Sequence, residues 1–233
     1  MFVLDPILMK SVIVRVAGFI AVMVVCLGFR ADVANGGTTI QPASASTTVA
    51  SLFSAGHTID QSGLSTGYTS GVTDFNTYIT SGPTAFHGFG ANVWAAAEGI
   101  RSGNFDFGLG GTYPIDAMAF WNAFNDPSAV RQFNILVDDN TAFSSPVDLG
   151  TFTASNTLGT GGNTAAEVFT FAATSASFVR LRILNTWSGS SYSIVSNEAA
   201  FRASSVPEPS TLISAGIAGL SLFGMIRRRS SRA

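Results

Sequence analysis

The chain has 233 residues, of which only 11% are charged and 24 are glycine. An average globular domain has about a quarter charged residues, so this composition is atypical of a cytosolic enzyme. Residues 46–205 contain five arginines and eleven acidic residues, a net charge of −6 that repels the phosphate backbone of nucleic acid. The composition therefore favours an extracellular β protein and excludes a nucleic-acid binder.

The N-terminal segment has the pattern of an export signal. Lys10 and Arg15 precede an apolar run over residues 16–27, a length typical of the hydrophobic region of a signal peptide. Small residues follow around Ala34, so we expect a signal peptide over residues 1–36. The alternative is an uncleaved membrane anchor, but the run is short for a transmembrane helix of roughly 20 residues and carries Arg15.

The only cysteine, Cys26, lies inside this apolar run. Removal of the signal peptide would leave a mature chain without cysteine, and therefore without a disulfide or a cysteine metal site. Acylation of Cys26, as in a lipoprotein, is disfavoured by the bulky Val25 that precedes it.

The C-terminus has three parts in a fixed order. Residues 206–211 read V-P-E-P-S-T, residues 212–226 are apolar and rich in small residues, and three arginines follow. The prolines prevent a helix before the apolar segment, and that segment is long enough to span a thin bilayer. The arginines would hold its end on the cytoplasmic side. We therefore predict a transmembrane helix over residues 212–226, because a buried helix of the domain would need one polar face.

This tail, residues 204–233, resembles the PEP-CTERM sorting signal of Gram-negative bacteria. The residues that carry the resemblance are Val206, Pro207, Glu208, Pro209, Arg227, Arg228 and Arg229. The resemblance implies that the tail first anchors the chain in the membrane, and that an exosortase, a membrane protease-transferase, then cleaves near the motif. It also implies a destination at the cell surface or in an exopolysaccharide matrix, as in a biofilm.

Short β-like runs alternate with turn signals in the second half of the body. The runs are 104–109, 115–121, 131–138, 147–154, 167–171, 178–184 and 197–202. Alternation is clearest where Val179, Leu181 and Ile183 are expected to face the core. No amphipathic helix of ordinary length interrupts the runs. We therefore predict an all-β fold, an antiparallel β-sandwich or jelly roll, flanked by a signal helix and a transmembrane helix.

The body resembles the discoidin-type, galactose-binding-like β-sandwich, which also occurs in coagulation-factor C domains and in carbohydrate-binding modules. The resembling stretch is 55–203, preceded by a linker or first edge strand over 37–54. Its motifs are N-F-D-F-G-L-G from residue 104, I-D-A-M-A-F-W-N from 115, F-N-I-L-V-D from 133, V-R-L-R-I-L from 179 and N-E-A-A-F from 197. The paired cysteines of the family are absent from this sequence.

The resemblance also implies a structural Ca²⁺ site between a loop near the start of the domain and the last strand. Asp74, Asn76 and Thr77 are the candidates in the loop, and Glu198 is the candidate in the strand. Ca²⁺ takes six to eight oxygen ligands, and these side chains supply oxygen atoms. The alternative is an ordinary Asx turn at Asp74 and a hydrogen-bonded Glu198.

In this fold, loops at one end of the sandwich usually hold the ligand, with exposed aromatic rings that pack against sugar faces. The candidates are Trp187, Tyr192 and Trp94, with Arg101 as a polar partner. Trp187 lies in a Gly/Ser-rich stretch, so we expect it to be the most exposed. Trp94 is equally suited to the core, since tryptophan is largely buried in most proteins.

Neither H-E-x-x-H nor the P-loop, two sequence motifs of known catalytic sites, occurs in the chain. We therefore predict a noncatalytic exported surface or matrix protein that binds a glycan and is sorted by an exosortase. A structural or adhesive envelope protein without a sugar site is the first alternative. A secreted hydrolase is a distant one.

Overall fold

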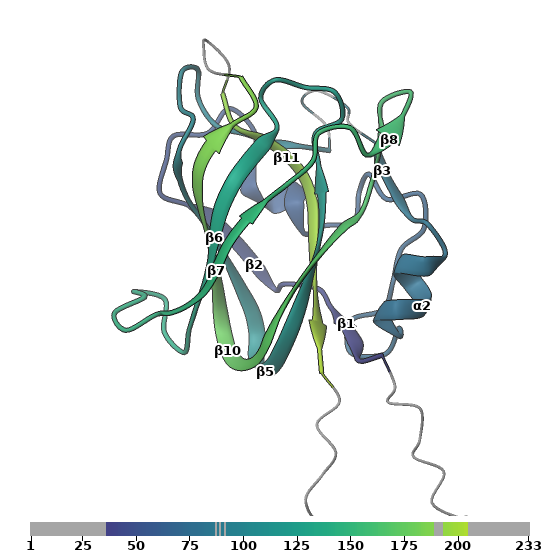
Figure 1. Ribbon diagram of the computed structural model, residues 1–233, viewed down its shortest axis with the longest axis vertical. Helices are drawn as coiled ribbons and strands as arrows, with labels where there is room; N and C mark the ends of the chain where they lie inside the picture. The colour runs from purple at the N-terminus through teal and green to yellow at the C-terminus, as the bar shows by residue number, and fades with distance from the viewer. Residues whose placement is uncertain (1–35, 87, 89, 91, 189–192, 205–233) are drawn as a thin grey trace, which may run out of the picture. The chain divides into compact units, whose positions relative to one another are not determined.

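The computed structural model describes residues 36–86, 88, 90, 92–188 and 193–204 (Figure 1). The elements in chain order are β1 (Thr38–Ile40), β2 (Ser44–Thr47), the 3-10 helix η1 (Ala55–Thr58), α2 (Phe75–Thr80), β3 (Thr84–Phe86), β4 (Trp94–Ala95), β5 (Gly103–Asn122), β6 (Val130–Asp138), β7 (Val147–Thr153), β8 (Gly159–Thr160), β9 (Asn163–Ala165), β10 (Glu167–Thr186) and β11 (Val195–Ala203). Every ladder between these strands is antiparallel. The prediction of an all-β antiparallel fold is confirmed.

Eight strands belong to one sheet, in the order β1-β11-β5-β10-β6-β7, with β2 also paired to β5 and β4 to β11. The two 20-residue strands, β5 and β10, pair along most of their length, with register shifts near Thr174 and Ala176. On one side of these shifts β5 lies between β2 and β10, and on the other side it lies between β11 and β10. The long strands therefore connect two layers (Figure 1). Layer one contains β2, β6 and β7, and layer two contains β1 and β11.

Aromatic contacts show that the two layers face each other. The ring of Phe107 in layer one lies 5.5 Å from that of Phe201, which is opposite Met118 in layer two. A straight strand would place residues 107 and 118 about 36 Å apart, so β5 must fold back between them. Phe133 in layer one similarly lies 5.2 Å from Phe169 in layer two. These rings form the core of a β-sandwich.

The predicted alternation in β10 is confirmed. Val179, Leu181 and Ile183 face the core and are at most 3% exposed, whereas Arg182 between them is exposed. The predicted runs 104–109 and 115–121 are two halves of β5, and the runs 167–171 and 178–184 are two halves of β10.

A second cluster covers the outer face of layer two. Ala117 and Ala119 of β5 and Ala200 of β11 present small side chains there, which leaves room for the rings of Phe75 and Tyr78 from α2. Burial of these two rings stabilises the fold by about 2–3 kcal/mol each. Residues 64–85 therefore form a cover over layer two.

The first and last strands of the body are neighbours. In the β1–β11 ladder, Thr38 lies opposite Ala203, and Ser204 N–H donates to the carbonyl of Pro114 at 2.7 Å. The sheet therefore begins at Thr38, inside the stretch 37–54 predicted as a linker or first edge strand, rather than at residue 55. Among the described residues, the core clusters run from Ile40 to Ala203, so the strands of the sandwich and the core between them lie within residues 36–204.

The predicted signal peptide and the predicted transmembrane helix over 212–226 fall on residues outside those described, except for Gly36. Within the described ranges, no helix is both long and apolar enough to cross a membrane.

Candidate functional site

Trp187 follows β10 directly and is held in place by two hydrogen bonds. Its backbone N–H donates to the carbonyl of Ala129 at 3.1 Å, and its indole Nε1–H donates to the carbonyl of Ala154 at 3.0 Å. The side chain is nevertheless 39% exposed. Two different chain segments therefore fix the orientation of a ring that solvent can reach.

Arg131, at the start of β6, covers part of this ring. Its guanidinium carbon lies 5.1 Å from the centroid of Trp187, within the distance of a cation–π contact. The next residue, Gln132, accepts a hydrogen bond of 2.9 Å from the side-chain amide of Asn185. An aromatic face with guanidinium and amide groups beside it suits a ligand that has both C–H and hydroxyl groups, because the ring packs against the former and the polar groups bind the latter.

This group of residues, which we call the Trp187 site, lies at the end of the sandwich where β10 ends and where β5, β6 and β11 begin. Arg101 lies exposed in the connection before β5, and the carbonyl of Ile100 accepts a hydrogen bond of 2.9 Å from Ile194 N–H. The structure thus places Arg101 at the same end as Trp187. Tyr192 falls outside the described residues.

The sequence allows Trp94 either a ligand-binding role or a place in the core, and the structure places it in the core. The side chain is 1% exposed, its ring packs edge-on against Phe105 with centroids 4.6 Å apart, and its Nε1–H donates to Ser51 Oγ at 2.9 Å. β4 carries Trp94 into the core because it pairs with β11. A buried ring cannot stack on a sugar, so Trp94 is a core residue.

Sequence reasoning missed Arg131 and Gln132 as neighbours of Trp187. More than fifty residues separate them along the chain, and only the β6–β10 register, in which Gln132 lies opposite Asn185, brings them together. A weak signal was available, because Arg131 is one of five basic residues between residues 46 and 205.

The predicted calcium ligands occupy two places. Asp74 is the N-cap of α2, where its Oδ1 accepts from Thr77 N–H at 2.7 Å, and Asn76 Oδ1 accepts from Arg202 at 3.1 Å. Glu198 lies four residues before Arg202 on β11, which corresponds to about 13 Å of strand. One ion bound by all four side chains does not fit this spacing, and calcium binding stays a prediction.

Glu198 is almost fully buried and accepts a hydrogen bond of 2.6 Å from Gln61 N–H. Burial raises the pKa of its carboxyl group to about 8, because the charged form loses its hydration, although the Gln61 N–H lowers it. The neighbouring Asp60 carboxylate raises it further. The bond to Gln61 ties the loop before Tyr68 to the last strand.

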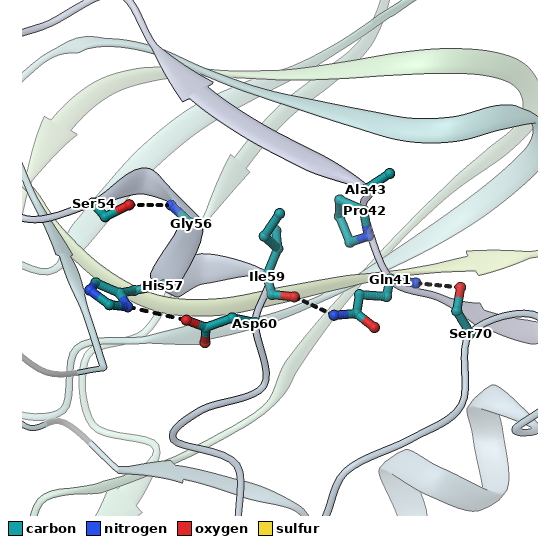
Figure 2. A pocket seen from close by; sticks show the side chains of 9 residues that line it. All are labelled: Gln41, Pro42, Ala43, Ser54, Gly56, His57, Ile59, Asp60 and Ser70. Atoms are coloured by element: carbon teal, nitrogen blue, oxygen red, sulfur yellow. Dashed lines mark hydrogen bonds and ion pairs between the residues drawn. The ribbon is translucent and has the colours of Figure 1, made fainter.

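A shallow hollow lies beside β2, lined by His57 and Asp60 among others (Figure 2). His57 Nδ1 contacts Asp60 Oδ2 at 3.2 Å, a pairing that also occurs in hydrolases, where it orients a general base. The nearby Ser54 Oγ accepts from Gly56 N–H at 3.1 Å. His57 N–H donates to the carbonyl of Ser54 at 3.2 Å, but among the described residues no side-chain hydrogen bond joins the two, so the three side chains do not form a catalytic triad.

The family model of the PEP-CTERM protein-sorting motif matches residues 205–230. The chain carries this sorting motif. The match includes the predicted residues from Val206 to Pro209 and the arginines at 227–229, so the predicted resemblance is confirmed. A PEP-CTERM motif implies that the protein is exported and sorted to the surface.

Several solved structures of carbohydrate-binding modules are partly similar to the body. The family 32 module of AlyQ, in complex with 4,5-unsaturated mannuronic acid, is 16% identical with a TM-score of 0.45, over 70% of this chain and 96% of the module. The family 32 module of NanJ from C. perfringens, in complex with galactose, is 14% identical with a TM-score of 0.44, over 70% and 97%. A chitosan-binding module from Paenibacillus sp. IK-5 is 18% identical with a TM-score of 0.43, over 70% and 95%. No curated protein matches the sequence.

Proposed function

We propose that the protein is a noncatalytic glycan-binding protein of the bacterial surface, in which Trp187 is the platform for a sugar ring. The observation that carries the proposal is the fixed and exposed indole of Trp187 with the guanidinium of Arg131 beside it. An apolar ring in such a setting packs against the C–H face of a pyranose, and the guanidinium donates to its hydroxyl groups. Arg101, at the same end, is a further donor.

The sorting motif supports the location of this function. Because the motif implies export of the protein, the body works outside the cytoplasm. Polysaccharides of the envelope and matrix are the abundant polar polymers there. In the proposed sequence, a signal peptide directs export, the segment 212–226 holds the chain in the membrane of a Gram-negative cell, and an exosortase cleaves close to Pro207 and Pro209. The product associates with exopolysaccharide.

The chemistry of the site supports binding rather than turnover. The Trp187 site combines a ring with a guanidinium and amides, and none of these groups acts as a general acid or base near neutral pH. The sandwich would therefore retain a glycan without cleaving it.

Nuclear magnetic resonance of the indole N–H groups tests the proposal directly. Each of the three tryptophans gives one such signal, and the two buried ones serve as internal controls, since Trp94 donates to Ser51 and Trp121 donates to Pro83. Titration of residues 36–204 with oligosaccharides from the exopolysaccharide of the bacterium that produces the protein should shift the Trp187 signal and leave the other two in place.

Matched variants separate stacking from a general surface effect. We expect Trp187→Ala to weaken oligosaccharide binding at least tenfold, which is about 1.4 kcal/mol. Val147→Ala should leave affinity unchanged, because Val147 is also an exposed apolar side chain but lies at the start of β7, at the other end of the sandwich. Absence of binding in the unmodified protein would refute the glycan proposal and favour a structural or adhesive envelope protein.

A further inference from the structure

The hollow beside β2 is a second concave site, separate from Trp187. Its cavity volume is about 520 Å³, within the range of small-molecule sites. The residues that line it are Gln41, Pro42, Ala43, Ser54, Gly56, His57, Ile59, Asp60 and Ser70. They come from the β1–β2 connection, from η1 and the residues around it, and from the loop before α2, so three segments meet here.

Hydrogen bonds fix these segments before any ligand arrives. Gln41 is central, since its backbone N–H donates to Ser70 Oγ at 3.1 Å and its Nε2 donates to the carbonyl of Ile59 at 2.6 Å (Figure 2). Its Oε1 accepts from Gln61 Nε2 at 2.9 Å. A site that is already ordered loses little conformational entropy on binding, which favours affinity for small ligands.

The polar groups at the rim retain hydrogen-bonding capacity. His57 uses Nδ1 toward Asp60, which leaves Nε2 of the ring for a ligand. Ser54 and Ser70 each accept a backbone hydrogen bond through Oγ, so that their hydroxyl hydrogens can still be donated. The Asp60 carboxylate can accept further hydrogen bonds.

The hollow combines apolar and polar groups, a combination that suits a neutral saccharide. Ala43 and Ile59 offer aliphatic surface for C–H groups, while Asp60 and His57 match vicinal hydroxyl groups. The carboxylate of Asp60 repels an anionic uronate. We infer that the hollow is a saccharide subsite for a neutral pyranose residue and that the protein is consequently a bivalent glycan binder. Bivalency, but not the subsite itself, rests on the proposed function of Trp187.

The sheet order places the two sites at opposite edges of layer one. The strands run β2-β5-β10-β6-β7, so that the hollow adjoins β2 while Trp187 contacts the start of β6 and the end of β7. Three strand spacings separate β2 from β6, which is about 14 Å. One sugar residue cannot occupy both sites, but two polysaccharide chains can, and the protein would then cross-link them.

The subsite is tested by amide resonances of residues 36–204 during titration with the methyl glycosides of glucose, galactose and mannose, and with glucuronate. We expect the amide signals of Gly56 and His57 to shift with at least one neutral glycoside and not with glucuronate. The same shifts should persist in Trp187→Ala. Failure of the Trp187 signal to move would count only against the proposed function, whereas unmoved Gly56 and His57 signals would overturn the subsite.

Two variants confirm where the sugar binds. Asp60→Asn retains the shape of the side chain but removes its charge, and should weaken binding of the neutral glycoside at least fivefold. Ala43→Phe leaves His57 and Asp60 intact and fills the hollow from an exposed position, so it should abolish the shifts. A fold check by amide dispersion accompanies both, and unchanged glycoside affinity in Ala43→Phe would overturn the subsite.

Cross-linking is measured with a soluble polyacrylamide that carries many copies of the best-binding glycoside. We expect turbidity with the unmodified protein, and clear solutions with Trp187→Ala or Ala43→Phe alone. If Ala43→Phe precipitates the polymer as well as the unmodified protein does, the bivalent assignment is wrong.

Discussion

Arg180 of β10 lies opposite Asp106 of β5 in the sheet register, and two hydrogen bonds of 2.6 and 2.7 Å join the guanidinium to the carboxylate. Both side chains are more than four-fifths buried, and the ring of Phe143 lies 4.0 Å from the guanidinium carbon. The contact between Phe143 and Arg180 therefore joins the loop between β6 and β7 to the outer face of layer one.

Arg180→Ala should destabilise the protein by about 2 kcal/mol, because it leaves the carboxylate of Asp106 mostly buried without its partner. Arg182→Ala is the matched control. Its nearest carboxylate, Asp148, is 3.9 Å away and half exposed, and its other partner, the amide oxygen of Asn134, is uncharged, so the loss should be smaller, about 1 kcal/mol. Urea unfolding of the two variants measures the difference, and equal losses would contradict the prediction.

Asp138 should make the β6–β7 loop sensitive to acid. Although its burial opposes the shift, hydrogen bonds from the N–H groups of Ser145, Asp139 and Asn140 lower the pKa of Asp138. A carboxyl group whose folded pKa is lowered stabilises the fold above its ordinary pKa, and this contribution is lost as pH falls through the lower value. Thermal melts below pH 4 should therefore show a steeper fall for the unmodified protein than for Asp138→Asn, and parallel curves would count against this role.

Glu198 has the opposite effect on stability. Its pKa is raised to about 8 by burial, so between its ordinary value of 4.5 and about 8 the folded state binds a proton that the unfolded state does not. Stability should fall as pH rises through this range, by at most about 1.4 kcal/mol per pH unit. Glu198→Gln should be the more stable protein at pH 8, and the two melting curves should converge near pH 5 if a chelator is present.

Asp74 should act as a helix cap. Asp74→Ala removes the acceptor for Thr77 N–H and should cost about 1 kcal/mol, whereas Asp74→Asn retains an acceptor and should cost much less. We expect this pattern with and without Ca²⁺. A rise in melting temperature with Ca²⁺ that both Asp74→Asn and Glu198→Gln abolish would instead establish the calcium site.

The strands of layer one and layer two were predictable because their side chains alternate between core and solvent. Val179, Leu181 and Ile183 show this pattern without any knowledge of their neighbours. The continuity of β5 was harder to predict, since Gly108 to Gly111 has the composition of a turn. Gly110 does adopt a positive φ of 78°, but at a point where the strand bends from one layer into the other rather than ends.

Sites assembled from distant segments were less predictable than strands. The exposure of Trp187 followed from its Gly/Ser-rich surroundings, whereas Arg131 reaches it only through the register of β6. The hollow beside β2 depends on Gln41 and His57, which the sequence alone does not place together. Local composition says little about such contacts, because they depend on the register of the strands and on how the connections between them pack.

The direction of β11 determines where the Trp187 site lies relative to the sorting motif. The strand starts at Val195, bridged to Ala129 beside Trp187, and ends at Ala203, one residue before the hydrogen bond from Ser204 to Pro114. Its nine residues place these points about 26 Å apart. The sorting motif begins at residue 205, directly after this second point. If the chain is attached to the membrane through the motif, the indole of Trp187 therefore lies at the opposite end of the sandwich from the attachment. Severing the chain there would detach the body with every strand that the structure describes still in it.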